Sequence, residues 1–153
     1  MRSRFCLFVA LSLAALPRLH AEAGKDSPYE TVLIEPLKTS IYVGHVTLKT
    51  TPMKRTGDAY AANYDAKVFP YFFESEKGQL SITFTEDDLA KLAKGQVVFF
   101  KGHAENSDHT PRRIEGRALP ADAFHGKIKV RVFVTEKLEL IFNGEYRFSE
   151  SHG

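Results

Sequence analysis

The stretch Lys127-Ile-Lys-Val-Arg-Val-Phe-Val-Thr-Glu-Lys-Leu-Glu-Leu-Ile-Phe142 alternates between charged and apolar residues over most of its length. Every second position from Ile128 to Phe142 is apolar, with Glu136 as the exception. A period of two is typical of a β-strand that buries one face and leaves the other in water. This stretch therefore predicts two antiparallel strands or one long bent strand.

The register of this pair depends on the length of its loop. A two-residue turn would set Val132 opposite Glu139 and mix charges into the apolar face. A three-residue loop at 135–137 instead pairs Val132 with Leu140. We expect the odd-length loop and keep the bent strand as the alternative, because Lys137 stands where such loops usually carry glycine.

The same pattern extends along the chain. Segments rich in Val, Ile, Tyr, Phe and Thr alternate with segments rich in Gly, Pro, Asn and Asp, as expected for strands joined by turns. The expected strands cover residues 31–35, 40–49, 60–69, 79–84, 96–105, 113–119, 127–134 and 138–142, with a short last strand at 146–148, and the expected loops cover 50–58, 106–111 and 120–126.

One helix interrupts the strands. Thr85 is a suitable N-cap, acidic residues follow it in the first turn, and Gly95 ends the segment after two lysines. Leu89 and Leu92 begin a narrow apolar stripe that can dock on a sheet. The sequence thus predicts an all-β, single-domain antiparallel barrel or sandwich of about eight strands, with one short α-helix at about 85–94.

The N-terminal segment has the features of a secretory signal peptide. Two arginines precede an uncharged run from Phe5 to Leu16, and Ala21-Glu22-Ala23 offers the small residues that a signal peptidase reads. The run is shorter than the roughly 20 residues of a membrane-spanning helix, so an N-terminal anchor is the less favoured alternative. We expect a signal peptide over residues 1–23, one β-rich domain over 24–148 and a flexible tail at 149–153.

Removal of that segment changes the charge and the cysteine content. The full chain has 21 basic and 19 acidic residues, and loss of three arginines and one glutamate leaves 18 of each. A mature chain without net charge offers no electrostatic case for binding nucleic acid or an anionic membrane. The only cysteine, Cys6, also leaves, so the domain folds without disulfides. We expect a periplasmic or secreted protein, with a bacterial envelope favoured.

The segment Phe99–Gly116 raises the question of a metal site, because it holds His103 and His109 among acidic residues. Pairing Glu105 with Arg113 across a turn gathers His103 and these charges on one face and leaves the other face small and apolar. Zinc needs three or four ligands in tight geometry. We therefore expect a solvated charge ladder without a metal, and His103 and His109 remain the second-ranked metal hypothesis.

The sequence contains none of the familiar catalytic motifs. It has no G-x-S-x-G, no H-E-x-x-H and no glycine-rich phosphate loop. Acids such as Glu74 and Glu76 flank a predicted turn. We expect a protein that is not an enzyme and that uses no cofactor.

Two segments are candidates for binding. Val68-Phe-Pro-Tyr-Phe-Phe73 is apolar on both faces, which a strand with one wet side does not need. It is either a strand end buried on both sides under the helix, or an aromatic patch at the lip of a pocket. The loop Thr50–Asp58 carries a basic pair that suits an anionic partner, or it is a plain hairpin tip. The candidate binding residues are Phe69, Tyr71, Phe72, Phe73, Lys54 and Arg55.

These features favour an exported, non-catalytic β-domain that acts as a binding or structural module toward a protein, a glycan or an apolar ligand. The architecture resembles the lipocalin-like barrels, although none of their signature residues can be matched, and a lipocalin-like carrier of an apolar small molecule is the alternative. A small outer-membrane barrel also has alternating strands behind a signal peptide. The helix, and strands shorter than the roughly 9–11 residues of a span, disfavour it. A hollow interior would favour the carrier, and a packed interior would favour a protein-binding module.

Overall fold

The computed structural model describes residues 27–149, so the expected signal peptide and most of the expected tail lie outside the described residues. The described part contains ten strands and two short helices. The strands are β1 (Thr31–Ile34), β2 (Leu37–Ser40), β3 (His45–Thr50), β4 (Met53–Thr56), β5 (Ala59–Phe69), β6 (Glu76–Thr83), β7 (Val98–Asn106), β8 (Pro111–Pro120), β9 (His125–Phe133) and β10 (Glu139–Phe148), and the helices are η1 (Phe72–Glu74) and α1 (Glu86–Ala93).

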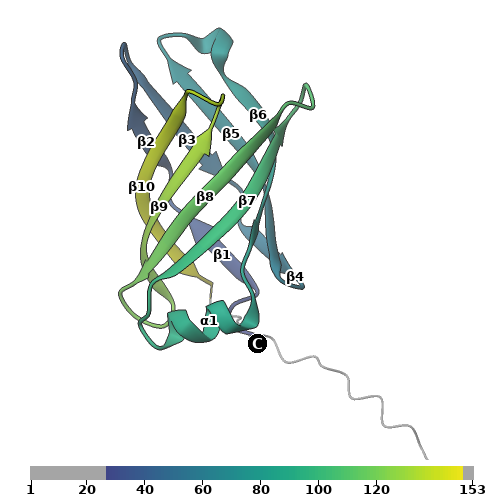
Figure 1. Cartoon of the computed structure of the whole chain (residues 1–153), viewed down its shortest axis with the longest axis vertical. Coiled ribbons are helices and arrows are strands. Elements are labelled where there is room, and N and C mark those ends of the chain that lie inside the picture. The colour runs from purple at the N-terminus through teal and green to yellow at the C-terminus, as the bar shows by residue number, and fades with distance from the viewer. Residues whose placement is uncertain (1–26, 150–153) are drawn as a thin grey trace, which may run out of the picture.

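The strands close into an antiparallel barrel. Strands that follow one another in the chain pair from β5 to β10, and β10 pairs with both β1 and β2 to complete the ring. β1 and β2 share one position around the barrel, and β3 and β4 share the next, because both β3 and β4 pair with β5. The expected all-β fold is confirmed, and the closed ring shows a barrel of eight strand positions rather than a sandwich (Figure 1).

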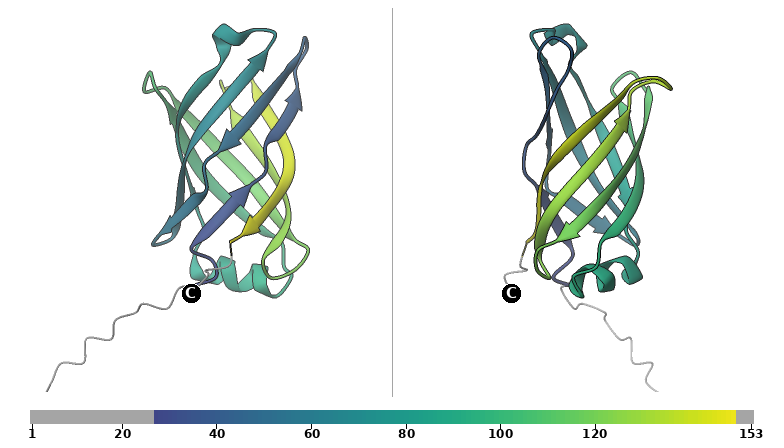
Figure 2. Two further views of the ribbon diagram at one scale, coloured as in Figure 1. Left: turned by 180° about the vertical axis from the view of Figure 1, so that it is seen from behind. Right: turned by 60° about the vertical axis from the view of Figure 1, so that its left-hand side comes forward.

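Helix α1 lies across one end of the barrel, between β6 and β7 in the chain (Figures 1 and 2). Its first turn is capped as the sequence predicts. The hydroxyl of Thr85 accepts a hydrogen bond from the Asp88 N–H at 3.2 Å, and the Asp88 carboxylate accepts one from the Thr85 N–H at 3.0 Å. Leu89 and Leu92 are buried, so the predicted apolar stripe packs onto the barrel interior and closes this end.

Side chains alternate between the interior and the outer surface as the period of two predicts. In β7, Phe100 and Ala104 are buried, whereas Lys101 and His103 are exposed. This alternation confirms the predicted inner and outer faces of the β7–β8 hairpin.

The predicted three-residue loop of the C-terminal pair is also confirmed. Val132 pairs with Leu140, and the Val134 N–H donates to the Leu138 carbonyl at 2.9 Å, which leaves residues 135–137 as the loop. The burial is less uniform than expected, because Leu138 remains 50 % exposed at the end of the hairpin.

The expected strand at 40–49 is wrong in its first half, whereas its second half belongs to β3. Residues 41–44 form a turn between β2 and β3, and Gly44 has a φ of +109°. A Cβ at this position would lie 1.8 Å from the carbonyl oxygen of Phe69. Only glycine fits such a backbone, so the chain reverses here. The expected loop at 50–58 is wrong as well, because it contains β4, whose Met53 is buried in the core.

The register of the β7–β8 hairpin differs from the expected one by two residues. His103 pairs with Arg113, and Glu105 pairs with Pro111 instead of Arg113. The turn is tighter than expected because the side-chain oxygen of Asn106 accepts two backbone N–H groups, at 3.0 and 2.9 Å. An even shift keeps every side chain on its expected face, which is why the prediction of faces survived.

Strand β10 is longer than expected, because it runs unbroken through Asn143 and Gly144 to Phe148. In sequence Asn-Gly is a strong turn signal. In the barrel a Cβ on Gly144 would lie 2.1 Å from the Leu37 side chain of β2. The glycine therefore permits a close approach between neighbouring strands instead of making a turn.

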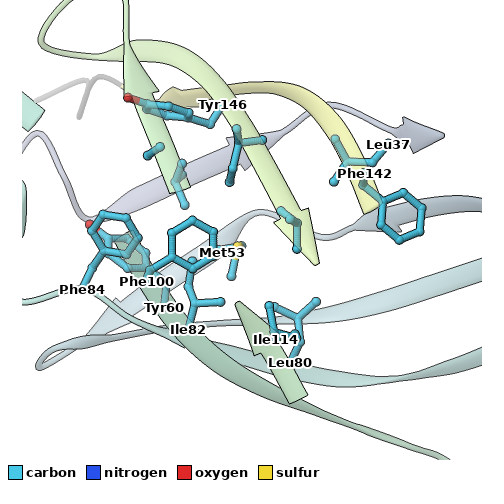
Figure 3. Packing of buried hydrophobic residues seen from close by; sticks show 14 of the residues in the cluster. Leu37, Met53, Tyr60, Leu80, Ile82, Phe84, Phe100, Ile114, Phe142 and Tyr146 are labelled. Carbon is cyan, nitrogen blue, oxygen red and sulfur yellow. The ribbon is translucent and has the colours of Figure 1, made fainter. Parts of the chain in front are cut away.

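The interior has two halves of different character. Beside α1, the rings of Tyr60, Phe84, Phe100 and Phe148 fill the barrel, with centroids of contacting pairs 5.3 to 6.3 Å apart. Figure 3 shows Tyr60, Phe84 and Phe100 packed close together. The void left among these side chains is only about 20 Å³. We call this half the packed end, and the half away from α1 the hollow end.

Candidate functional site

The hollow end of the barrel contains a cavity of about 300 Å³. This volume is at the lower limit of the roughly 300–1,000 Å³ of small-molecule sites. Most inward side chains here are aliphatic, with Tyr64, Arg112 and Phe142 as larger members of the lining, and together they leave this space unfilled. The aliphatic lining includes Val46, Leu48, Val68, Ile114, Val132 and Leu140.

The cavity opens at the end of the barrel opposite α1. Tyr71, Glu74 and Leu138 line the cavity and are also exposed at the surface. The opening, which we call the mouth, therefore lies between the segment around η1 and the β9–β10 loop (Figure 1).

Exposed aromatic side chains lie on one side of the mouth, in the segment around η1. Phe72 is 63 % exposed and Phe73 is 80 % exposed, while Phe69 and Tyr71 are about half-exposed. Of these four sequence candidates, Tyr71 lines the cavity itself and the other three flank it. The hypothesis that this segment is buried under the helix is wrong, because α1 covers the other end of the barrel (Figure 2). What remains is the hypothesis of an aromatic lip on a pocket.

Four polar side chains from four consecutive strands meet on the cavity wall. They are Tyr64 of β5, Glu76 of β6, Asn106 of β7 and Arg112 of β8, and we call them the Glu76 cluster. The Glu76 carboxylate accepts hydrogen bonds from the Tyr64 hydroxyl at 2.9 Å and from the Asn106 amide at 3.1 Å. It also accepts from Arg112, through Nη2 at 3.0 Å and Nε at 3.5 Å. Arg112 Nη1 donates to the Val134 carbonyl at 2.9 Å.

The environment of the Glu76 cluster sets its protonation state. Burial alone raises the pKa of Glu76, but hydrogen bonds from Arg112, Asn106 and Tyr64, with the positive charge of Arg112, outweigh burial and leave the pKa below its ordinary value. Burial raises the pKa of Tyr64, and its hydrogen bond to Glu76 raises it further. At neutral pH the cluster is therefore a carboxylate–guanidinium pair with a protonated tyrosine.

The two basic sequence candidates lie at the packed end. The guanidinium of Arg55 is 2.7 Å from the Glu86 carboxylate at the start of α1, and its side chain is only 8 % exposed. Lys54, its neighbour on β4, is exposed on the outside of the barrel. The structure brings neither residue to the cavity, and Arg55 instead ties β4 to the helix.

The two histidines of the metal hypothesis lie on the outer surface of the barrel. His103 is exposed on β7, and His109 Nδ1 is 2.6 Å from a Glu105 carboxylate oxygen, with both side chains in water. Among residues 27–149, no group of three or more His, Cys, Asp or Glu side chains could hold a metal ion.

Sequence reasoning missed Glu76 and Arg112, the two charged residues of the cluster. The expected strands began at residues 79 and 113, so both residues fell into presumed turns. A detectable signal was nevertheless present in the alternation of inward and outward residues. Leu80 and Ile114 point inward, and so do the even-numbered residues before them in the same strands. This places Glu76 and Arg112, one charge of each sign, inside the barrel. Charged residues at inward positions are rare unless they are paired.

Comparison of the chain with protein-family models, with curated proteins and with solved structures gives no match. In the part of the chain that the structure describes, no helix has the length and apolar character needed to cross a membrane. The cavity and its surroundings are therefore the observations that bear on function.

Proposed function

We propose that this protein is a non-catalytic binding protein that holds a small apolar molecule inside the hollow end of its barrel. The observation that carries the proposal is the apolar cavity of about 300 Å³, which opens at the mouth. Protein interiors are otherwise packed as densely as organic crystals, and the other half of this barrel is packed in that way. A space of this size lined by aliphatic side chains fits a ligand-binding role.

The polarity of the outer surface supports the proposal that water surrounds the barrel. The outward residues Lys101, His103 and Arg113 of the β7–β8 hairpin are exposed and polar, with Phe99 as an exposed apolar exception. The buried inward residues of the same strands, such as Phe100 and Ile114, are apolar. A transmembrane barrel has the opposite pattern, with an apolar band on the outside. This polarity favours the binding protein over an outer-membrane barrel.

The Glu76 cluster supports binding rather than catalysis. A general base needs an accessible lone pair within reach of a substrate, and a general acid needs a proton to give. The ionised Glu76 carboxylate already accepts hydrogen bonds from Tyr64, Asn106 and Arg112. The carboxylate therefore has no free lone pair with which to act as a base, and the cluster forms a polar section of the cavity wall.

A neutral fluorescent probe, N-phenyl-1-naphthylamine, tests the proposal. We expect saturable binding of one probe per chain, with emission enhanced by the apolar cavity. Val132→Phe places a ring in the cavity and should weaken binding at least about tenfold, which corresponds to about 1.4 kcal/mol. Ile141→Phe, on the outer face of β10, is the matched control and should bind as the wild type does. No saturable binding, or equal loss in both variants, would contradict the proposal.

We further propose that the protein is exported to the periplasm or the cell exterior. The basic start, the apolar run and Ala21-Glu22-Ala23 support this location. Mass spectrometry of the exported protein should find an N-terminus at Gly24, and a mature protein that begins at Met1 would overturn it.

A further inference from the structure

We infer that the ligand is uncharged: it carries no carboxylate, phosphate or ammonium group, and a carbonyl, ester or hydroxyl oxygen is the polar group that faces Arg112. This inference rests on the proposed function, since it names the class of molecule that the same cavity takes. It is drawn from the charges and hydrogen bonds of the cavity wall.

Three charged side chains line the cavity, namely Glu74, Glu76 and Arg112. Glu76 and Arg112 neutralise each other, with the carboxylate and guanidinium 3.0 Å apart and the side chains 26 % and 16 % exposed. Glu74 is exposed at the mouth, where water screens its charge. The three side chains together give the wall one net negative charge, which comes from Glu74 at the mouth. No net positive charge on the wall attracts an anion.

Arg112 is poorly placed to receive an anion, because its guanidinium already serves the cavity wall. The edge formed by Nε and Nη2 faces Glu76, and Nη1 bonds the Val134 carbonyl. A ligand carboxylate would put a second anion on one guanidinium in a largely apolar site, and an uncompensated buried charge is costly. Of the five N–H groups of arginine, two remain for a neutral oxygen acceptor.

Glu76 is equally unsuited to receive a cation. Tyr64, Asn106 and Arg112 together supply four donors to its two oxygens, which is the number of lone-pair sites on a carboxylate. An ammonium group would have to displace one of these donors and would leave it without a partner. An uncharged ligand displaces none of these donors from Glu76, because its hydrocarbon chain contacts only the aliphatic part of the wall.

The test compares three competitors that share one ten-carbon chain, decan-1-ol, decanoate and decylammonium, near neutral pH. The two ions are kept below their critical micelle concentrations and decan-1-ol below its solubility limit. Displacement of bound N-phenyl-1-naphthylamine gives the affinity of each. We expect decan-1-ol to bind at least about tenfold more tightly than either ion, because about 1.4 kcal/mol of desolvation suffices for that ratio.

Variants that change the charge of the wall sharpen the test. Glu76→Gln leaves Arg112 uncompensated, so decanoate should gain at least about tenfold relative to decan-1-ol. Arg112→Gln leaves the carboxylate uncompensated, so decylammonium should gain instead. The double variant Glu76→Gln/Arg112→Gln has no charge pair and should restore the preference for decan-1-ol. Cooperative urea unfolding of each variant checks that it is folded.

The outcomes separate this inference from the proposed function. Wild-type protein that binds the probe, but binds decanoate or decylammonium within about threefold of decan-1-ol, overturns the inference and leaves the binding function standing. Wild-type protein that binds neither the probe nor any competitor overturns the proposed function itself. The wild-type ranking decides the inference even where a variant fails to fold.

Discussion

The packed end and the hollow end of the barrel have the same strands and the same alternation, but they differ in the size of the inward side chains. At the packed end, aromatic rings such as Phe84 and Phe100 leave a void of about 20 Å³. At the hollow end, a mainly aliphatic lining that also includes Tyr64 and Phe142 leaves about 300 Å³. Strand number and tilt set the width of a barrel along its whole length, so side-chain volume decides whether each layer is filled.

The polar groups of the two ends differ in a similar way. Inside the packed end the polar groups include two neutral tyrosine hydroxyls: Tyr60 donates to the Tyr29 carbonyl, and burial raises the pKa of Tyr146 to about 12. The charged pair of this end, Arg55 and Glu86, joins β4 to α1, with the Glu86 side chain in water. At the hollow end the Glu76 cluster holds two full charges, close to the mouth and to water. An ion pair loses less solvation free energy at such a position than deep in a core. The denser packing therefore lies at one end, and the proposed binding site lies at the other.

The largest effect is expected from truncation at the packed end. Phe100→Ala should lower the free energy of unfolding by about 3–5 kcal/mol, because it removes a buried ring and leaves a cavity. Val132→Ala, its counterpart at the hollow end, faces space that is already empty and should cost about 1 kcal/mol or less. Urea denaturation measures both. Similar losses in the two variants would show that the halves do not differ in packing.

The opposite change, added volume, should also separate the two ends. A Cβ on Gly116 would lie 2.3 Å from the Phe100 ring and 2.7 Å from the Lys129 carbonyl oxygen. Gly116→Ala should therefore lower the free energy of unfolding by about 1–3 kcal/mol through overpacking. Val132→Phe adds more atoms, yet it should cost less because the cavity accommodates them. A greater loss from Val132→Phe would mean that the hollow end is closed in solution.

The charge pair of the hollow end predicts a dependence on pH. The pKa of Glu76 in the folded protein lies below its ordinary 4.5. Its carboxylate thus stabilises the fold above about pH 4.5, and this contribution is lost as the pH falls through the lower folded value. Glu76→Gln should lower the free energy of unfolding by about 1–3 kcal/mol at neutral pH, with a smaller difference in acid.

Urea titrations from neutral pH down into the acid range measure this difference. Glu145→Gln, at an exposed outward position of β10, is the matched control and should follow the wild type at every pH. A difference between Glu76→Gln and wild type that stays constant with pH would contradict a depressed pKa for Glu76.

The smallest effect is expected on the outer wall, which belongs to neither interior half. His103→Ala and His109→Ala should each change the free energy of unfolding by no more than about 0.5 kcal/mol, as exposed substitutions usually do. Metal analysis of the purified protein provides the second measurement. If the wild type holds stoichiometric zinc and the double variant does not, the two histidines form a metal site, and the expectation of a solvated charge ladder is wrong.

Local patterns account for much of the fold. The alternation around Val132 and Leu140 predicted the C-terminal hairpin and its loop, and the cap at Thr85 predicted α1. Both depend on interactions between residues close in sequence, which composition and spacing express directly. For the aromatic segment Phe69–Phe73 the sequence left two hypotheses, and the structure excludes burial under the helix, because these side chains are exposed and Tyr71 lines the cavity.

Distant contacts decided the rest. Gly44 and Gly144 both resemble turn glycines in sequence, but one makes a turn and the other permits two strands to approach, because their surroundings come from β5 and β2. The ion pair between Glu76 and Arg112 forms only when β6, β7 and β8 pair side by side. The sequence by itself determined which side of each strand is apolar. Only the closed barrel decided which inward residues face one another, and hence where the interior is packed and where it is hollow.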